Sequence, residues 1–251
     1  SEYGKKCAII EMKTIGGTCV NVGCVPKKVM WYAANTATTI NNAPGFGFEI
    51  DGVDFSWQKL KQGRDNYIKG ITTWYDGYLA SLGIDYINGF ASLVDKNTVS
   101  VNGDTFTADH IVLSPGSAPF VPSIDGANFG ITSDDFFELN ELPRKIAIVG
   151  GGFIAVEMAH IFGSFGSEVT MILRGEEFLS EADLSIRERI TKIYKDRFTV
   201  HTTEEVEHVS YEEKFLINLK QGSEIEADEL LIATGRNPNT VFLEPAKGGI
   251  D

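Results

Sequence analysis

Two cysteines, Cys19 and Cys24, lie five positions apart in a glycine-rich segment that reads GGTCVNVGCVPKK over residues 16–28. Such a pair can close one small, strained disulfide, accept two electrons and pass them on by thiol–disulfide exchange. Pro26 suits the first position of a helix, so Cys24 is expected just before a helix that begins at Pro26. There the positive end of the helix and the charges of Lys27 and Lys28 favour its thiolate. The segment therefore predicts a redox-active thiol pair.

Two other uses of the cysteine pair are less favoured. Zinc takes four ligands, and the pair offers only two. A plain structural disulfide is disfavoured because the chain has three cysteines, an odd number that is typical of a reducing compartment. Cytoplasm is therefore the expected location. The third cysteine, Cys7, opens the apolar stretch Cys7–Ile10, where we expect a buried strand and a buried structural thiol.

The thirteen residues 16–28 resemble the active-site segment of the glutathione reductase family of flavin-dependent disulfide reductases. The resemblance implies FAD and NADPH as cofactors and oxidised glutathione as the disulfide substrate. It implies that Cys19 attacks the substrate and carries the mixed disulfide, while Cys24 faces the flavin as a charge-transfer thiolate. It also implies that Lys27 lies by the flavin and that Glu157 holds this lysine where the nicotinamide arrives.

A second motif indicates a nucleotide site. Residues 150–155 read GGGFIA, between an apolar strand at 145–149 and a helix at 153–165. In this dinucleotide fingerprint Gly150 allows the tight turn and Gly152 lets the backbone approach the pyrophosphate. The strand before it and the helix after it are the context that confirms such a motif. Within the family that the chain resembles, Ala155 in place of a third glycine is commoner among NADP binders.

Arg174 ends the next expected strand, 168–173, where an NAD enzyme usually has an acidic residue. A cation there pairs with the 2′-phosphate of NADP, and a solvated surface arginine is the alternative. The family's NADPH-preferring members carry a second arginine six positions later, where this chain has Ser180. Three acidic residues also crowd the site with like charge to the phosphate, which reduces the margin of NADPH over NADH: Glu176, Glu177 and Glu181.

The resemblance implies further contacts. Those with FAD or the nicotinamide nucleotide are at Glu11, Thr18, Cys19, Lys27, Ala91, Gly116, Gly150, Gly152, Ile154, Ala155, Glu157, Arg174 and Gly235. Tyr75 matches a tyrosine that touches glutathione, with a surface aromatic as the equal alternative. Phe153 matches a tyrosine that covers the empty nicotinamide pocket, with core packing as the equal alternative. Pro115 departs from the family's usual turn beside Gly116, so we expect local cofactor packing there to differ from the family's.

Two segments echo one another: 111–116 reads IVLSPG and 230–235 reads LLIATG. Each is expected to be a hydrophobic strand that ends in a tight glycine turn after a small β-meander. The repeat predicts an α/β protein of two tandem Rossmann-like, three-layer domains that bind FAD and NAD(P), each with a small β-meander. We expect the FAD-binding domain at 1–142, the NADPH-binding domain at 143–237 and the start of a return to the FAD domain at 238–251.

The remaining elements follow from hydrophobic periodicity and turn residues. Helices are expected at 26–40 and 55–81, a glycine- and asparagine-rich loop at 41–54, and short strands within 84–109. Asn102-Gly103 is a strong hairpin signal among those strands. Glu11 ends the first strand as the acidic residue of a dinucleotide-binding unit does, about 20 residues after its glycine turn. We therefore expect that the chain lacks that turn and the strand before it.

The formal charge of −13, from 22 basic and 35 acidic residues, argues against nucleic acid and against anionic membranes. No apolar run approaches the roughly 20 residues of a membrane span, and no signal peptide is visible. We expect neither partner, and no metal.

The resemblance also implies parts that this sequence does not contain. The family has a longer C-terminal region with an interface domain that builds a homodimer and supplies an acid–base histidine from the partner subunit. None of His110, His160, His201 and His208 lies in a comparable motif, so no general base is assigned, and the chain alone is expected to bind FAD poorly and to turn over little. The alternatives are a reductase of trypanothione, mycothione, dihydrolipoamide or a metal, or a non-catalytic nucleotide-binding module. Pro26-Lys27-Lys28 and Arg174 argue against a lipoamide enzyme.

Overall fold

The structure is a computed structural model that describes residues 4–250, and its chain divides into two compact units. The first takes the residues up to Pro26, Asp65–Ala118 and the residues from Asn237 on. The second takes Lys27–Arg64 and Pro119–Arg236. This division differs from the expected domain boundaries because residues 27–64 group with the nucleotide motif. That residues 1–142 bind FAD and residues 143–237 bind NADPH remains a prediction.

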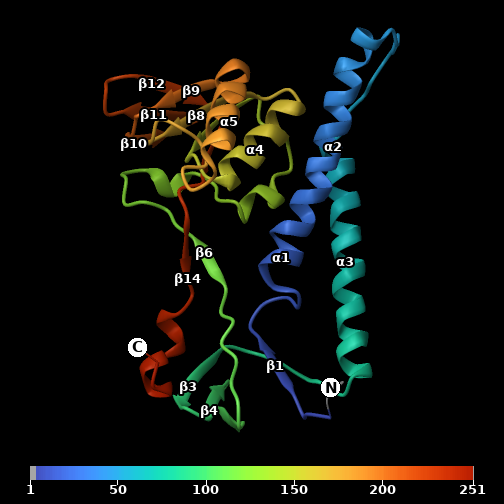
Figure 1. The fold of residues 1–251 in the computed structure, drawn as a ribbon, viewed down its shortest axis with the longest axis vertical. Helices are drawn as coiled ribbons and strands as arrows, with labels where there is room; N and C mark the ends of the chain where they lie inside the picture. Colours follow the sequence, from blue (N-terminus) through green and yellow to red (C-terminus); the bar gives the residue numbers. More distant parts are fainter. Residues whose placement is uncertain (1–3, 251) are drawn as a thin grey trace. The chain divides into compact units, whose positions relative to one another are not determined.

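The second unit contains a four-stranded parallel sheet in the order β13–β7–β8–β9, and its helices α4 and α5 are labelled in Figure 1. The elements are β7 Lys145–Val149, α4 Phe153–Ser164, β8 Glu168–Leu173, α5 Leu184–Arg197, β9 Thr199–Thr202 and β13 Glu229–Ile232. Strand β7 is buried from Ile146 to Val149, as expected for a central parallel strand covered on both faces. The predicted strand–turn–helix–strand at 145–173 is confirmed.

An antiparallel meander completes this unit: β10 Val206–Tyr211, β11 Phe215–Leu219 and β12 Glu224–Ala227. Alternate residues of β11, Phe215, Ile217 and Leu219, are buried, which is the period of two expected of a strand with one covered face. They belong to one core cluster with Val149 and Leu230 of the parallel sheet.

Residues 27–64 belong to the second unit because aromatic side chains pack on α4. Trp57 is 6% exposed, and its ring stacks over Phe162 with centroids 6.3 Å apart. Phe136 packs edge-on against both rings, and the Trp57 indole donates a hydrogen bond to the Leu139 carbonyl at 2.9 Å. The helices that begin and end this segment are α2 Cys24–Asn42 and α3 Trp57–Ser81. Both were predicted, and each begins two residues away from the predicted start.

The first unit contains a two-stranded parallel sheet, β1 Ala8–Glu11 with β2 Asp85–Asn88. Its meander consists of β3 Ala91–Asp95, β4 Thr98–Val101 and β5 Asp104–Thr107. Asn102 and Gly103 join β4 to β5 with φ values of 53° and 94°, so the predicted hairpin turn is confirmed. The short helix α1, Gly17–Asn21, was not predicted.

Two expectations for the first unit are wrong. Residues 111–114 form no strand, and Val112 is 86% exposed. Strand β1 is present but not buried, and Cys7 is only half-buried, with its thiol donating to the Lys5 carbonyl at 3.7 Å. The reason is the same for both. In the second unit β7 lies between β8 and β13, whereas among residues 4–250 no strand pairs with β1 except β2, and none pairs with 111–114.

Strands β6, Ser117–Pro119, and β14, Arg236–Pro238, pair with each other, and the chain passes from one unit to the other within each of them. Short 3₁₀ helices make up the other regular elements: η1 Ala43–Phe46, η2 Ala127–Phe129, η3 Asp135–Glu138, η4 Val241–Leu243 and η5 Pro245–Gly248. The two echoing glycine turns are confirmed, because Gly116 and Gly235 have φ values of 69° and 138°.

Candidate active site

The thiol pair lies on two consecutive helices. Cys19 is in the middle of α1, and Cys24 is the first residue of α2 rather than the residue before it. Both thiols are free and exposed. The pKa of Cys19 is raised, first because its thiol donates a hydrogen bond to Cys24 and second because of burial. The raised pKa favours the protonated thiol of Cys19, and Cys24 lies at the positive end of α2.

Two glycines that sequence reasoning did not single out shape this loop. Gly16 has a φ of 98°, and a Cβ there would lie 2.7 Å from that of Val20. A Cβ on Gly23 would lie 2.6 Å from the carbonyl oxygen of Thr18 and 3.1 Å from the Cα of Cys19. Only glycine allows so close an approach, so Gly23 brings the start of α2 against the residues around Cys19.

Asn21 closes the same loop from inside. Its side-chain amide donates to the carbonyl oxygens of Gly17 at 2.9 Å and Ile15 at 3.1 Å. These bonds satisfy backbone acceptors of an irregular turn, which fixes its shape. The signal in the sequence was a single asparagine between the two cysteines, which by itself predicts only a turn.

Lys27 and Glu157 meet as expected. The ammonium of Lys27 donates to the Glu157 carboxylate at 2.6 Å, and the two side chains are 23% and 28% exposed. Both residues belong to the second unit, so this contact joins α2 to α4 within one compact body. The separation in sequence is 130 residues, and only packing could bring the two charges together.

A second polar contact joins α2 to α4 two turns further on. His160 bonds Asn35 through Nε2 at 3.0 Å, and its Nδ1 lies 2.9 Å from the guanidinium of Arg197, the last residue of α5. Because arginine can only donate, Nδ1 accepts and the imidazole is neutral, with its proton on Nε2. Burial and then the charge of Arg197 lower the pKa of His160. These contacts hold His160 between α2, α4 and α5.

The turn after β7 has the geometry of a phosphate cradle. Gly150 has a φ of 134°, and a Cβ there would lie 2.2 Å from the carbonyl oxygen of Ala233, so this position accepts only glycine. A Cβ on Gly152 would meet nothing within 4 Å. Gly152 is the N-cap of α4, which also contains Ile154 and the buried Ala155. Open space at a helix N-terminus fits a pyrophosphate, so the residues present fit the expected nucleotide.

Phe153 begins α4 and is 66% exposed, which rules out core packing as its role within the described chain. The remaining alternative, an apolar cover over a nicotinamide pocket, stays a prediction. Arg174 follows the last residue of β8 and is exposed. Glu177, expected to repel a phosphate nearby, is instead paired with Arg187, with its Oε2 at 2.8 Å from Nη2 and 2.9 Å from Nε. Sequence reasoning missed Arg187.

The positions expected to contact FAD are distributed as follows. Glu11 ends β1, and its carboxylate accepts from the Lys13 amide at 2.9 Å. Thr18 is in α1, next to Cys19, and Ala91 begins β3. Gly116 lies in the first unit and Gly235 in the second, where its carbonyl accepts from the Phe120 amide at 2.9 Å. Their roles stay predictions.

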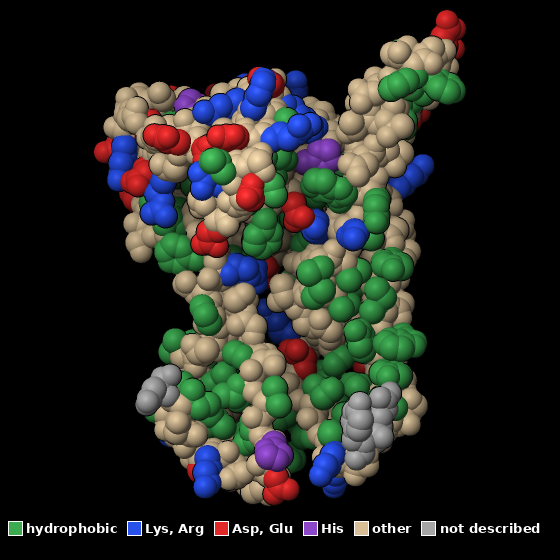
Figure 2. Space-filling view, viewed as in Figure 1, with side chains coloured by type: hydrophobic (Ala, Val, Ile, Leu, Met, Phe, Trp, Pro, Cys, Tyr) green, Lys and Arg blue, Asp and Glu red, His purple; other side chains and the backbone are tan. Residues whose placement is uncertain are grey.

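Tyr75 lies on α3 in the first unit, half-buried and in edge contact with Trp74 at 5.2 Å. Trp74 is 56% exposed and stacks on Tyr78 at 4.6 Å. Figure 2 shows hydrophobic side chains on the surface along α3. An exposed aromatic cluster of this kind agrees with both readings of Tyr75, a glutathione contact and a surface aromatic.

Residues 4–250 contain neither a membrane-spanning helix nor a cluster of metal ligands. Over residues 4–250, no helix is long and apolar enough to cross a membrane. Over the same range, no three or more histidine, cysteine or acidic side chains gather closely enough to hold a metal ion.

The fold and the site together define a Rossmann-type nucleotide-binding protein with a dithiol at a helix start. The model of the pyridine nucleotide-disulphide oxidoreductase family matches residues 1–251, and the chain belongs to this family. The predicted family and fold class are thereby confirmed.

Curated relatives are named glutathione reductase. The protein from Debaryomyces hansenii is 36% identical over 270 residues, which cover 94% of this chain and 55% of the relative. Those from Nostoc sp. and Yarrowia lipolytica are 34% and 37% identical over 255 and 270 residues, which cover 100% of this chain and 56% and 57% of the relatives. The chain thus spans about half the length of the curated relatives it matches.

Among solved structures, the HOCl-induced flavoprotein disulfide reductase RclA from Escherichia coli has a TM-score of 0.86 at 28% identity. The match covers 100% of this chain and 55% of that one. Its Cu(II) complex has a TM-score of 0.85 at 27% identity, with the same coverage.

Proposed function

We propose that the protein containing this chain is a flavin-dependent disulfide reductase that uses NADPH to reduce oxidised glutathione. One observation carries the proposal. The helix that begins with Cys24 also presents Lys27, which is bonded at 2.6 Å to Glu157 on the helix after the nucleotide turn. Lys27, three residues after Cys24 in sequence, thus pairs with the helix that follows the nucleotide turn. The relatives' name, glutathione reductase, supports the choice of substrate.

The chemistry assigned to the two thiols is the one that the family resemblance implies. Cys19, once deprotonated, attacks one sulfur of the substrate disulfide, forms a mixed disulfide and releases one glutathione thiolate, which takes up a proton. Cys24 then attacks the sulfur of Cys19, closes the Cys19–Cys24 disulfide and releases the second glutathione thiolate. When bound, FAD supplies the two-electron relay between NADPH and that disulfide.

The hydrogen bond to Cys24 raises the pKa of Cys19, so attack at neutral pH needs a base to take its proton. We assign that role to a histidine from the partner subunit of a homodimer, as the family resemblance implies, because no histidine of this chain lies in a comparable motif. Lys27 and Glu157 orient the nicotinamide end of the nucleotide, and Gly150 and Gly152 admit its pyrophosphate. The proposed location of the protein is a reducing cytoplasm.

A panel of disulfides with NADPH and NADH, run on the full-length protein, tests the proposal. We expect reduction of oxidised glutathione with NADPH, and a long-wavelength absorption band on two-electron reduction that is absent in Cys24→Ser. Faster turnover of trypanothione, mycothione, dihydrolipoamide disulfide or a metal ion would contradict the substrate. Failure to retain any flavin would contradict the enzyme class and favour a nucleotide-binding module.

The 251-residue chain alone is expected to retain FAD poorly. Among residues 4–250, no strand pairs with residues 111–114, and only β2 pairs with β1. Flavin absorbance after gel filtration measures this directly. A stoichiometric yellow complex that reduces oxidised glutathione would contradict the expectation.

A further inference from the structure

Arg187 is a cation of α5, an element that the nucleotide motif does not include, and it contacts the loop that follows β8. It lies in the first turns of α5, Leu184–Arg197, and is half-buried, as is its partner Glu177. Besides the two contacts to Glu177, Nη1 lies 3.4 Å from the carbonyl oxygen of Ser180, a long hydrogen bond. Ser180 is the position where the family's second arginine is missing.

The loop that Arg187 contacts is tied to the phosphate cradle. Leu179, between Glu177 and Ser180, donates its amide to the carbonyl of Gly151 at 2.8 Å. Gly150, in turn, donates its amide to Ile172 on β8 at 2.8 Å, two residues before Arg174. Arg174 is therefore two residues from one backbone hydrogen bond to the glycine turn, and the loop that Arg187 contacts makes another at Leu179.

Arg187 retains donors for a ligand. A guanidinium has five N–H groups, and the contacts with Glu177 and Ser180 use three of them. An arginine held by a carboxylate is pre-organised, and its planar fork suits a phosphate. The carboxylate of Glu177 also lowers the net positive charge of the site, which weakens the attraction for a dianion.

We propose that Arg187 and Arg174 together bind the 2′-phosphate of NADPH, with Glu177 holding Arg187 in place and opposing the phosphate charge. Arg187 thereby replaces, from α5, the arginine that is absent at position 180. This inference depends on the proposed use of NADPH, but its test requires no disulfide reduction.

The test is calorimetric binding of NADP⁺ and NAD⁺ to the full-length protein, wild type and variants. Hydrogen bonds to charged groups predict that Arg187→Gln weakens NADP⁺ binding on the order of tenfold or more and leaves NAD⁺ binding unchanged. Arg174→Gln should do the same. Glu177→Gln keeps a hydrogen-bond acceptor for Arg187 and removes its negative charge, so NADP⁺ should bind several times more tightly at low salt.

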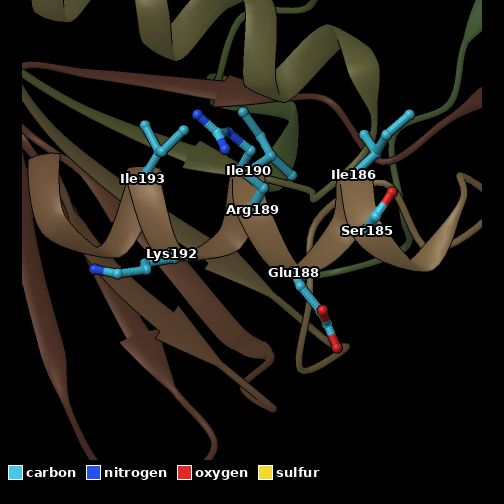
Figure 3. Close-up of a pocket in the computed structure, with 7 residues that line it drawn as sticks. All are labelled: Ser185, Ile186, Glu188, Arg189, Ile190, Lys192 and Ile193. Carbon is cyan, nitrogen blue, oxygen red and sulfur yellow. The ribbon is translucent and has the colours of Figure 1, made fainter.

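Arg189 is the matched control. It lies two positions along the same helix, about 200° around it from Arg187. Figure 3 shows Arg189 with Ile186, Ile190 and Ile193 on α5, at a shallow hollow. Arg189→Gln should change neither nucleotide's affinity.

Unchanged NADP⁺ binding in Arg187→Gln would overturn the proposal, as would a selective loss in Arg189→Gln. So would NADP⁺ binding that is weaker or unchanged in Glu177→Gln. If Arg187→Gln loses binding of both nucleotides through misfolding, Arg187→Lys is measured instead. A retained preference of Arg187→Lys for NADP⁺ supports the proposal. Equal loss of NADP⁺ and NAD⁺ binding overturns it and makes the Arg187–Glu177 pair purely structural. A protein that discriminates through Arg187 but reduces no disulfide would contradict the proposed function alone.

Discussion

Two glycines of one turn should fail in opposite ways when each becomes alanine. Gly150 has a φ of 134°, and its new Cβ would lie 2.2 Å from the carbonyl oxygen of Ala233 on the neighbouring chain segment. Gly152 has a φ of −80° and a ψ of 179°, which alanine adopts freely, and its Cβ would meet nothing within 4 Å. The added methyl group therefore tests the stability of the fold at Gly150 and the space for the ligand at Gly152.

The magnitudes follow from those distances. Gly150→Ala combines backbone strain of about 1–3 kcal/mol with overpacking of about 1–3 kcal/mol, so its melting temperature should fall by on the order of 10 °C. Gly152→Ala should stay within about 1 kcal/mol of the wild type, since only its helix-capping preference changes. Its methyl group, however, enters the space that the pyrophosphate needs, so NADP⁺ should bind at least about tenfold more weakly.

Thermal melts and NADP⁺ calorimetry on both variants of the full-length protein check these expectations. Gly151→Ala is an intermediate control, since its Cβ would meet the Leu173 side chain at 3.1 Å. Wild-type NADP⁺ affinity in Gly152→Ala would refute the placement of the pyrophosphate. A wild-type melting temperature in Gly150→Ala would refute the close approach of the turn to Ala233.

Three further expectations concern the charges and thiols. Glu157→Gln should lower kcat in NADPH-dependent turnover at least about tenfold. It should shift the melting temperature little, since an ion pair still partly open to solvent contributes on the order of 1 kcal/mol. An unchanged kcat would contradict this. Because burial and Arg197 lower the pKa of His160 in the folded state, its stability contribution is complete above about 6.5 and is lost as the pH falls below it. Chemical unfolding between pH 5 and 8 should show that slope, and its persistence in His160→Gln would contradict the assignment. Removing the acceptor in Cys24→Ala should lower the pKa of Cys19 and speed its alkylation at pH 8, measured by mass spectrometry; slower alkylation would contradict the hydrogen bond.

The second unit was largely predictable because its signals are local. An apolar strand at 145–149, three glycines and a helix make a pattern in which each residue type has a backbone reason. The Asn102-Gly103 turn is of the same kind, since positive φ at two consecutive positions selects these residues.

Predictions failed where the outcome depends on a distant partner. Residues 111–114 have as apolar a sequence as β13, yet only β13 has a neighbouring strand among the described residues. A hydrophobic run becomes a strand only when another strand accepts its hydrogen bonds. Strand β1 pairs only with β2 among residues 4–250, so it is not buried, although its sequence reads as buried.

The residues of the candidate site also differ in whether the local sequence or a tertiary contact reveals them. Cys19, Cys24 and the turn from Gly150 to Gly152 could be recognised from residue type and short spacing, because their chemistry needs neighbours in sequence. Gly23 was missed, since its role is a close contact with the backbone around Cys19 that no local pattern encodes.

The sequence by itself determined the redox thiols, the nucleotide turn and the α/β class, since these follow from periodicity, glycine geometry and thiol chemistry over a few residues. Only the tertiary structure decided which charges meet. Lys27 and Glu157 are 130 residues apart, and Arg187 reaches the loop at Ser180 from the next helix. Ionic contacts act over a few ångströms, so the packing of α2 on α4 and of α5 beside the turn selects them from the chain's 22 basic and 35 acidic side chains.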